Sequence, residues 1–203
     1  HEGPKLIFPA ELLEPWDWSG VDVTKESLWK DGQPRADSIQ AKAAERFING
    51  GFDVVFDDDA PGEAADLVCL KREKDHIRLV LVHCKFTTAP AGQRVKDLVE
   101  VCSQAVRSGR WLWNFRGLCR HLSTREQRLR SAERSTRFLH GNIREIGPLL
   151  QASRFHEVRG EVVVVQPGLS VANQTPDQIK ILAAAHSFLK DTVGVSLDVI
   201  CSV

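Results

Sequence analysis

The residues best suited to chemistry lie at the ends of two apolar runs. Asp66 opens the first run and follows an acidic segment over residues 57–63. The second run ends in His83, Cys84 and Lys85. Because strand side chains alternate between faces, His83 and Lys85 project together and Cys84 points the other way. Carboxylates on one strand beside a lysine on the next predict a metal site.

The elements that must position these residues occur in the order helix, three strands, helix, strand. Ser38 or Asp37 is suited to cap the first helix, and Gly50-Gly51 to end it. The segments before and after the acidic turn have the composition of a hairpin. The predicted ranges are 38–48 for the first helix, 52–56, 65–70 and 77–86 for the three strands, 92–107 for the second helix and 161–165 for the last strand.

The rest of the chain adds segments around this core. Residues 1–36 read as a lead-in that packs Trp16, Trp18 and Trp29 onto the core, and residues 111–155 as an arginine-rich helical insertion. Thr175 to Gln178 form a capping box that opens a helix to Lys190. The remaining predictions are helices near 124–139 and 142–151, a final strand over 195–201, and a core position for His186.

The length and composition indicate one domain, and the order of its predicted helices and strands indicates the α/β class. The chain has 203 residues, of which 42% are apolar and 27% charged, as is typical of soluble globular domains. We expect a lead-in (1–36), a core (37–110), an insertion (111–155) and a returning strand, helix and strand (156–203). The five cysteines are scattered singly, which favours reduced core residues. No run approaches the roughly 20 apolar residues of a membrane span, so we expect a cytoplasmic protein with no membrane partner. The absence of methionine suggests an excised piece.

A net charge of zero conceals two oppositely charged parts. Residues 1–70 hold 15 acidic and 6 basic side chains, a net of −9, whereas residues 106–160 hold 12 arginines and 4 glutamates, a net of +8. Such asymmetry indicates a polyanionic partner such as nucleic acid, although a solvated helical face is the plain alternative. The arginines that could contact phosphates are Arg107, Arg110, Arg116, Arg120, Arg125, Arg128, Arg130, Arg134 and Arg137.

The chain resembles the PD-(D/E)xK nuclease superfamily, which has the restriction-endonuclease-like fold. The resemblance rests on the order of elements, on Asp66 in the second strand and on His83-Cys84-Lys85 in the third. The resemblance covers residues 38–107 and resumes at 161–165. It implies that Glu45 is the acidic residue of the first helix and that Asp66 holds Mg²⁺. It also makes Lys85 the catalytic lysine and Gln104 the glutamine found on the following helix in exonuclease-like branches.

The physical chemistry agrees with this resemblance. Hydrolysis of a phosphodiester needs a hard cation, Mg²⁺ or Mn²⁺, to neutralise the phosphate and acidify a water. Asp66 with Glu45 or Glu63 can hold such an ion. Lys85 could orient or deprotonate the nucleophile, or stabilise charge on the phosphate. Alternatively, Asp66 serves only a turn and Lys85 only caps a strand.

His83 departs from the family pattern, because an acid usually stands at its position. Three interpretations remain open: His83 itself ligates the metal, another carboxylate replaces it, or the site is degenerate. The candidate replacements are Glu63, Asp97 and Glu100. Asp57, Asp58 and Asp59 are predicted turn residues, with Asp59 the nearest to the metal.

Two functions compete. The first is a metal-dependent nuclease domain acting on DNA, joined to a helicase or other motor in a larger protein, such as an antiviral defence protein of bacteria. The second is a catalytically degenerate module that binds nucleic acid or a partner subunit. A purely structural docking domain is a third reading.

Overall fold

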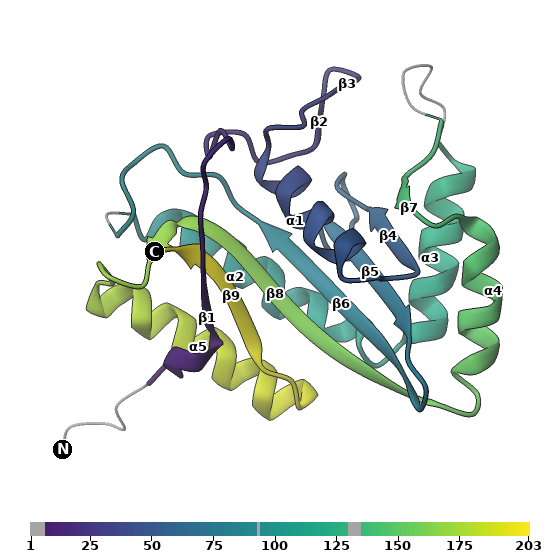
Figure 1. Ribbon diagram of the computed structural model, residues 1–203. Coiled ribbons are helices and arrows are strands. Elements are labelled where there is room, and N and C mark those ends of the chain that lie inside the picture. The colour runs from purple at the N-terminus through teal and green to yellow at the C-terminus, as the bar shows by residue number, and fades with distance from the viewer. Residues whose placement is uncertain (1–6, 93, 130–134) are drawn as a thin grey trace.

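A computed structural model describes residues 7–92, 94–129 and 135–203. Its centre is a seven-stranded sheet in the order β1-β9-β8-β6-β5-β4-β7 (Figure 1). The strands of this sheet are β1 (Leu13–Trp16), β4 (Val54–Asp57), β5 (Leu67–Arg72), β6 (His76–Cys84), β7 (Phe138–His140), β8 (Glu157–Ser170) and β9 (Leu197–Ser202). A separate pair consists of β2 (Trp29–Lys30) and β3 (Gln33–Pro34).

The sheet is mixed, and β6 is the strand at which its two halves meet. β1, β9, β8 and β6 run parallel to one another, whereas β6, β5, β4 and β7 pair in antiparallel fashion. The predicted hairpin is confirmed, since Phe56 pairs with Val68 and Asp57 with Leu67. The acidic segment therefore returns the chain between two adjacent strands.

Helices cover both faces of this sheet (Figure 1). One face carries α1 and the lead-in tryptophans Trp16 and Trp18. The other face carries the remaining helices, with α2 and α5 over β8 and β9 and α3 and α4 over β4 to β6. The helix bounds are α1 (Ile39–Asn49), α2 (Lys96–Ser108), α3 (Phe115–Gln127), α4 (Ile143–Ala152) and α5 (Pro176–Val193).

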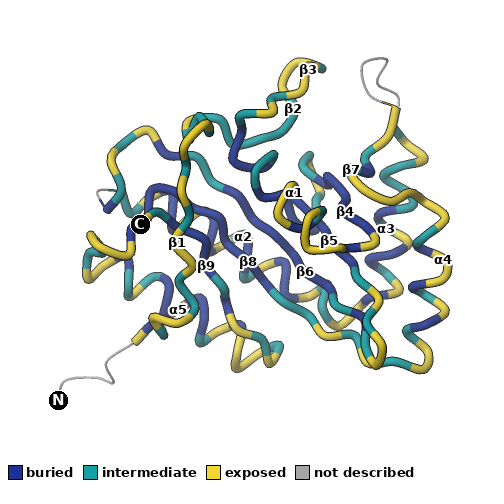
Figure 2. The backbone as a smooth tube through the Cα atoms, viewed as in Figure 1, coloured by how far each residue is buried: buried dark blue, intermediate teal, exposed yellow. Residues whose placement is uncertain are grey.

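Burial on both faces explains the unbroken apolar run of β8. Val162 and Val164 pack among α2 and α5, whereas Val163 and Val165 pack on the α1 side. Figure 2 shows this central part of the sheet as buried along β8 and β6. The chain is thus an α/β protein with a mixed central sheet and, among the residues described, five α-helices.

Several local predictions are confirmed. Ser38 caps α1, accepting a hydrogen bond from the Ala41 amide. Thr175 and Gln178 form the capping box of α5, which continues three residues past Lys190 and ends at Gly194, a residue with a φ of 77°. His186 is a core residue whose Nδ1 accepts from the Leu197 amide at 3.3 Å. The five cysteines are free and buried.

The predicted helix over 124–139 is wrong. The helix there, α3, occupies Phe115–Gln127, and Phe138–His140 forms the edge strand β7 instead. Phe115, Leu118 and Leu122, spaced by three and four residues, supply its apolar face. Arg130 and Arg134 lie outside the residues that the structure describes.

Other boundaries differ by a few residues. β6 ends at Cys84 and not at Phe86, and α2 begins at Lys96 and not at Gly92. The lead-in contributes β1 to the sheet edge, a strand too short to show an alternating pattern in the sequence. Within the parts of the chain described, none of the helices has the length and apolar character needed to cross a membrane.

Candidate metal centre

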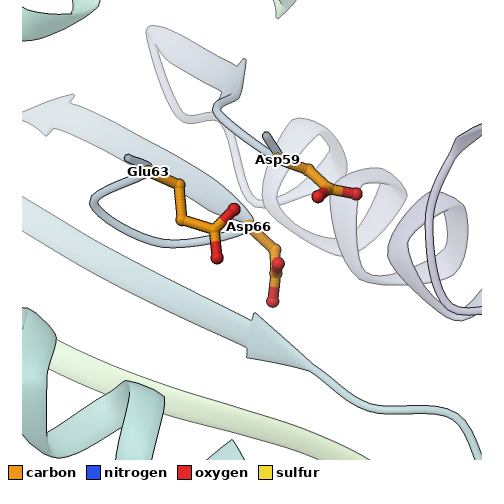
Figure 3. Close-up of side chains that lie close together, drawn as sticks. All are labelled: Asp59, Glu63 and Asp66. Carbon is orange, nitrogen blue, oxygen red and sulfur yellow. The ribbon is translucent and has the colours of Figure 1, made fainter. Parts of the chain in front are cut away.

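Three carboxylates meet beside the hairpin turn. One oxygen from each of Asp59, Glu63 and Asp66 lies within 4.8 Å of those of the other two, and Figure 3 shows the three side chains. Asp66 is buried, with 6% of its surface exposed, and the other two are half-buried. Among the described residues, this is the one group of three or more such side chains close enough to hold an ion.

Asp66 joins this group to β6. Its Oδ2 accepts a hydrogen bond from the Cys84 amide at 2.6 Å. Burial raises the pKa of Asp66 well above its ordinary value; the Cys84 amide opposes the rise, and the charges of Asp59, Glu63 and Glu26 add to it. Without a cation, the group therefore favours a proton on Asp66.

Asp58 holds the acidic segment against α3. Asp58 is fully buried, and its carboxylate lies 2.7 Å from Arg125 Nε and 2.8 Å from His121 Nε2 on α3. It also accepts from the Ala64 amide at 2.7 Å. These contacts fix the loop against α3, so Asp58 has a structural role beyond that of an ordinary turn residue.

Gln40 on α1 fixes the other side of the segment. This buried side chain donates from Nε2 to the Asp57 carboxylate and to the Asp66 carbonyl, both at 3.2 Å. Asp57 in turn accepts from the Asp59 amide at 3.1 Å. The position of the carboxylates thus depends on α1 as well as on α3.

Lys85 lies between two glutamates. Its Nζ is 3.2 Å from Glu26 and 3.1 Å from Glu100. Burial by itself lowers the pKa of Lys85, but the two carboxylates outweigh it and the pKa is raised. Lys85 is therefore a protonated ammonium group in this arrangement.

Glu26 is a member of the site that was not predicted from the sequence. Its carboxylate pairs with Lys85 and accepts from the Phe86 amide at 3.1 Å, and its carbonyl accepts from the Gln40 amide at 3.0 Å. Glu26 lies in the lead-in, where no sustained period marks an element. The lack of local pattern left no signal for its position.

The structure does not bring Glu45 to the carboxylate group. Ala43 and Phe47 face the sheet, and Glu45, two residues from each, lies on the exposed side of α1. There it borders a surface hollow with Trp16 and Lys42. The prediction that Glu45 belongs to the metal site requires this side chain to lie on the buried face of α1, and the structure places it on the exposed face.

His83 also lies outside the carboxylate group. It is 2% exposed, and neither ring nitrogen has a hydrogen-bond partner among the described residues. Burial, aided by the charge of Arg107, lowers its pKa to about 3. His83 is therefore a neutral imidazole at physiological pH, while Cys84 packs in the core on the α1 side, as alternation predicts.

His83 and Gln104 line one cleft of about 540 Å³, together with Glu63 of the carboxylate group. The remaining lining residues are Gly62, Ala64, Arg107, Ser108, Arg110 and Trp111. The cleft therefore adjoins the candidate metal centre, and the structure brings these predicted residues into one neighbourhood without placing His83 among the ligands.

The other candidate replacement acids have partners of their own. Asp97 is 3% exposed and lies 3.1 Å from Arg94 Nε. Glu100 is exposed and pairs with Lys85, which lowers the pKa of Glu100. Of the three candidates, only Glu63 belongs to the carboxylate group.

Those predicted phosphate-binding arginines that the structure describes fall into two sets. Arg125 pairs with buried Asp58, and Arg137 donates to the Asp57 carbonyl at 3.1 Å, so both hold the acidic segment. The exposed set consists of Arg107, Arg110, Arg116, Arg120 and Arg128. Two of these, Arg107 and Arg110, line the cleft.

Comparisons with protein-family models, with curated proteins and with solved structures found no match to this chain. The site must therefore be interpreted from its own geometry.

Proposed function

We propose that this chain is a metal-dependent phosphodiesterase domain that cuts nucleic acid, with DNA as the expected substrate and a core of the restriction-endonuclease-like type. One observation carries the proposal: the group of Asp59, Glu63 and Asp66 is hydrogen-bonded to the residue that precedes Lys85. A cation site and a positive side chain at the adjacent ends of two paired strands, β5 and β6, are the parts that phosphodiester hydrolysis requires.

The carboxylate group fits a hard divalent cation. Its donors are oxygens, which suit Mg²⁺ or Mn²⁺ better than a softer ion. The raised pKa of Asp66 indicates negative charge that the protein leaves uncompensated. Asp59, Glu63 and Asp66 would hold the ion, which would neutralise a phosphate and acidify a water.

Lys85 would act on the phosphate as a cation. Its raised pKa disfavours the neutral amine that a general base needs. An ammonium group can instead stabilise negative charge that develops on a phosphoryl oxygen. Glu26 and Glu100 would orient Lys85 for this role.

The exposed arginines would offset the repulsion between the carboxylates and a polyanion. Arg107 and Arg110 line the cleft beside Glu63, and Arg116 and Arg120 are exposed on the next helix, α3. Positive side chains near an acidic centre attract the nucleic-acid backbone and make binding salt-dependent.

The test is cleavage of plasmid and of single-stranded DNA with Mg²⁺ or Mn²⁺. We expect cutting by the wild type and by the control Glu45→Gln, and loss of cutting in Asp66→Asn and in Lys85→Met. Cutting that persists in both site variants would refute the site assignment.

The degenerate binding module remains a second candidate, because neutral His83 stands where an acid is usual and Lys85 already pairs with two glutamates. It predicts salt-sensitive binding of nucleic acid with no cleavage under any metal. Measuring binding and cutting on the same preparation separates the two functions.

A further inference from the structure

The cleft beside the carboxylates contains an unusual concentration of unsatisfied polar groups. Both ring nitrogens of His83, Oε1 of Gln104 and Nε1 of Trp111 are buried and meet no hydrogen-bonding group of the described residues. All three side chains line this cleft. Buried polar groups are nearly always paired, so three unpaired residues around one cavity indicate a ligand that would pair them.

The chemistry of these groups is mixed. Neutral His83 offers one donor and one acceptor, Oε1 of Gln104 accepts, and the Trp111 indole only donates. A phosphate could use the donors alone. The edge of a nucleobase presents donors and acceptors side by side, and therefore matches the set more completely.

The surroundings fit a nucleotide. The cleft volume of about 540 Å³ lies in the range of small-molecule sites. Exposed Arg107 and Arg110 line it and are available to a backbone phosphate, and Glu63 connects it to the metal centre. If a nucleic-acid chain placed one of its bases in this cleft, a phosphate of the same chain would lie near the carboxylates.

We propose that this cleft is a subsite for one unstacked nucleobase, recognised by His83, Gln104 and Trp111. The subsite rests on the proposed function for its substrate class, but base binding in it does not require cleavage. Because the unpaired atoms are buried in the free protein, binding must turn these side chains toward the base.

The test is binding by the metal-free domain of each of the four deoxynucleoside monophosphates and of deoxyribose phosphate, which lacks the base. Calorimetry gives the affinities, and nitrogen NMR of the imidazole reports on His83. We expect at least one base-bearing ligand to bind about tenfold or more tightly than deoxyribose phosphate. That ligand should also shift the His83 ring signals.

Gln104→Leu and Trp111→Phe should each remove most of this preference while retaining the affinity for deoxyribose phosphate. The matched control is Gln151→Leu, which replaces an exposed glutamine on α4 and should change nothing. His83 itself is buried, so its NMR signal reports on base binding without a change in its packing.

Equal affinity for all ligands, or base binding without any change at His83, would overturn the subsite. A domain that cuts DNA yet shows no preference for a base would refute this inference alone. A domain that binds a base in the cleft but never cuts would refute the proposed function and support the subsite.

Discussion

The Asp66 carboxylate and the Cys84 amide are joined by a hydrogen bond of 2.6 Å. This bond links the hairpin turn that carries the carboxylates to the strand end that carries Lys85. Because the two parts are held together, a change in Asp66 should be felt both in cation binding and in the stability of the fold.

Asp66→Asn should abolish cation binding and yet stabilise the metal-free fold at neutral pH. The pKa of Asp66 is raised on folding, so the folded chain binds a proton more readily than the unfolded one. Its ionisation therefore costs stability as pH rises above the ordinary aspartate range. Asparagine keeps an acceptor for the Cys84 amide and removes the charge. Denaturant unfolding should show a gain of about 1 to 3 kcal/mol. The control Asp191→Asn, at an exposed position of α5, should show no gain.

Cation affinity should rise with pH. A cation must displace the proton that the raised pKa of Asp66 favours, so binding releases protons. Calorimetry with Mn²⁺ between pH of about 6 and about 8 should show tighter binding at the higher pH. The proton release should be visible as a buffer-dependent enthalpy. An affinity independent of pH would count against Asp66 as a ligand.

Glu26→Gln should impair activity more than Glu100→Gln. Glu26 is 25% exposed and also accepts from the Phe86 amide, whereas Glu100 is 48% exposed. Because solvent screens the more exposed Glu100, its ion pair contributes less to holding Lys85. We expect a loss of about ten- to a hundredfold in cleavage rate for Glu26→Gln. Similar losses in both variants would mean that the two glutamates hold Lys85 equally, and Glu45→Gln serves as the exposed control.

His83 should make the protein sensitive to acid. Its pKa is lowered to about 3 in the folded state, below its ordinary value of 6.5, so the unfolded chain takes up the extra proton. The contribution of neutral His83 to the free energy of unfolding is therefore complete at a pH above its ordinary pKa of 6.5. It falls as the pH drops toward 3, by up to about 1.4 kcal/mol per pH unit. Replacing His83 with glutamine should flatten the stability profile between pH of about 6 and 4.5. An unchanged slope would show that His83 is not buried as a neutral ring.

Arg125→Met should destabilise the fold by about 3 kcal/mol, because it leaves the fully buried Asp58 carboxylate without its arginine partner. Arg120→Ala, on the exposed side of the same helix, should leave stability unchanged and weaken nucleic-acid binding at low salt. Denaturant unfolding and a salt titration of binding separate the two effects. Equal destabilisation by both variants would contradict the division of the arginines into two sets.

Short-range patterns made the central elements predictable. The Ser38 cap, the hairpin between β4 and β5, the buried run of β8 and the capping box at Thr175 each depend on neighbouring residues, and all are present. Charge patterning misled in the insertion, where an arginine-rich stretch reads as helix although the apolar residues that anchor α3 lie earlier.

The site was less predictable because its members meet through tertiary contacts. Asp66, Glu63 and Asp59 lie on one turn and were identifiable from the sequence. Glu26 was not, because its position depends on how the lead-in packs against Gln40 and Phe86. Glu45 misled because the helix period places it on the exposed face.

The position of β6 between an antiparallel hairpin and a parallel partner has a consequence for folding order. The carboxylates lie within a continuous segment from β4 to β6, so they can assemble through local contacts that form quickly. The pairing of β6 with β8 joins residues 76–84 to 157–165, and the contact of Lys85 with Glu26 needs the lead-in to dock. A refolding chain would thus gain its acidic group before its lysine is held in place.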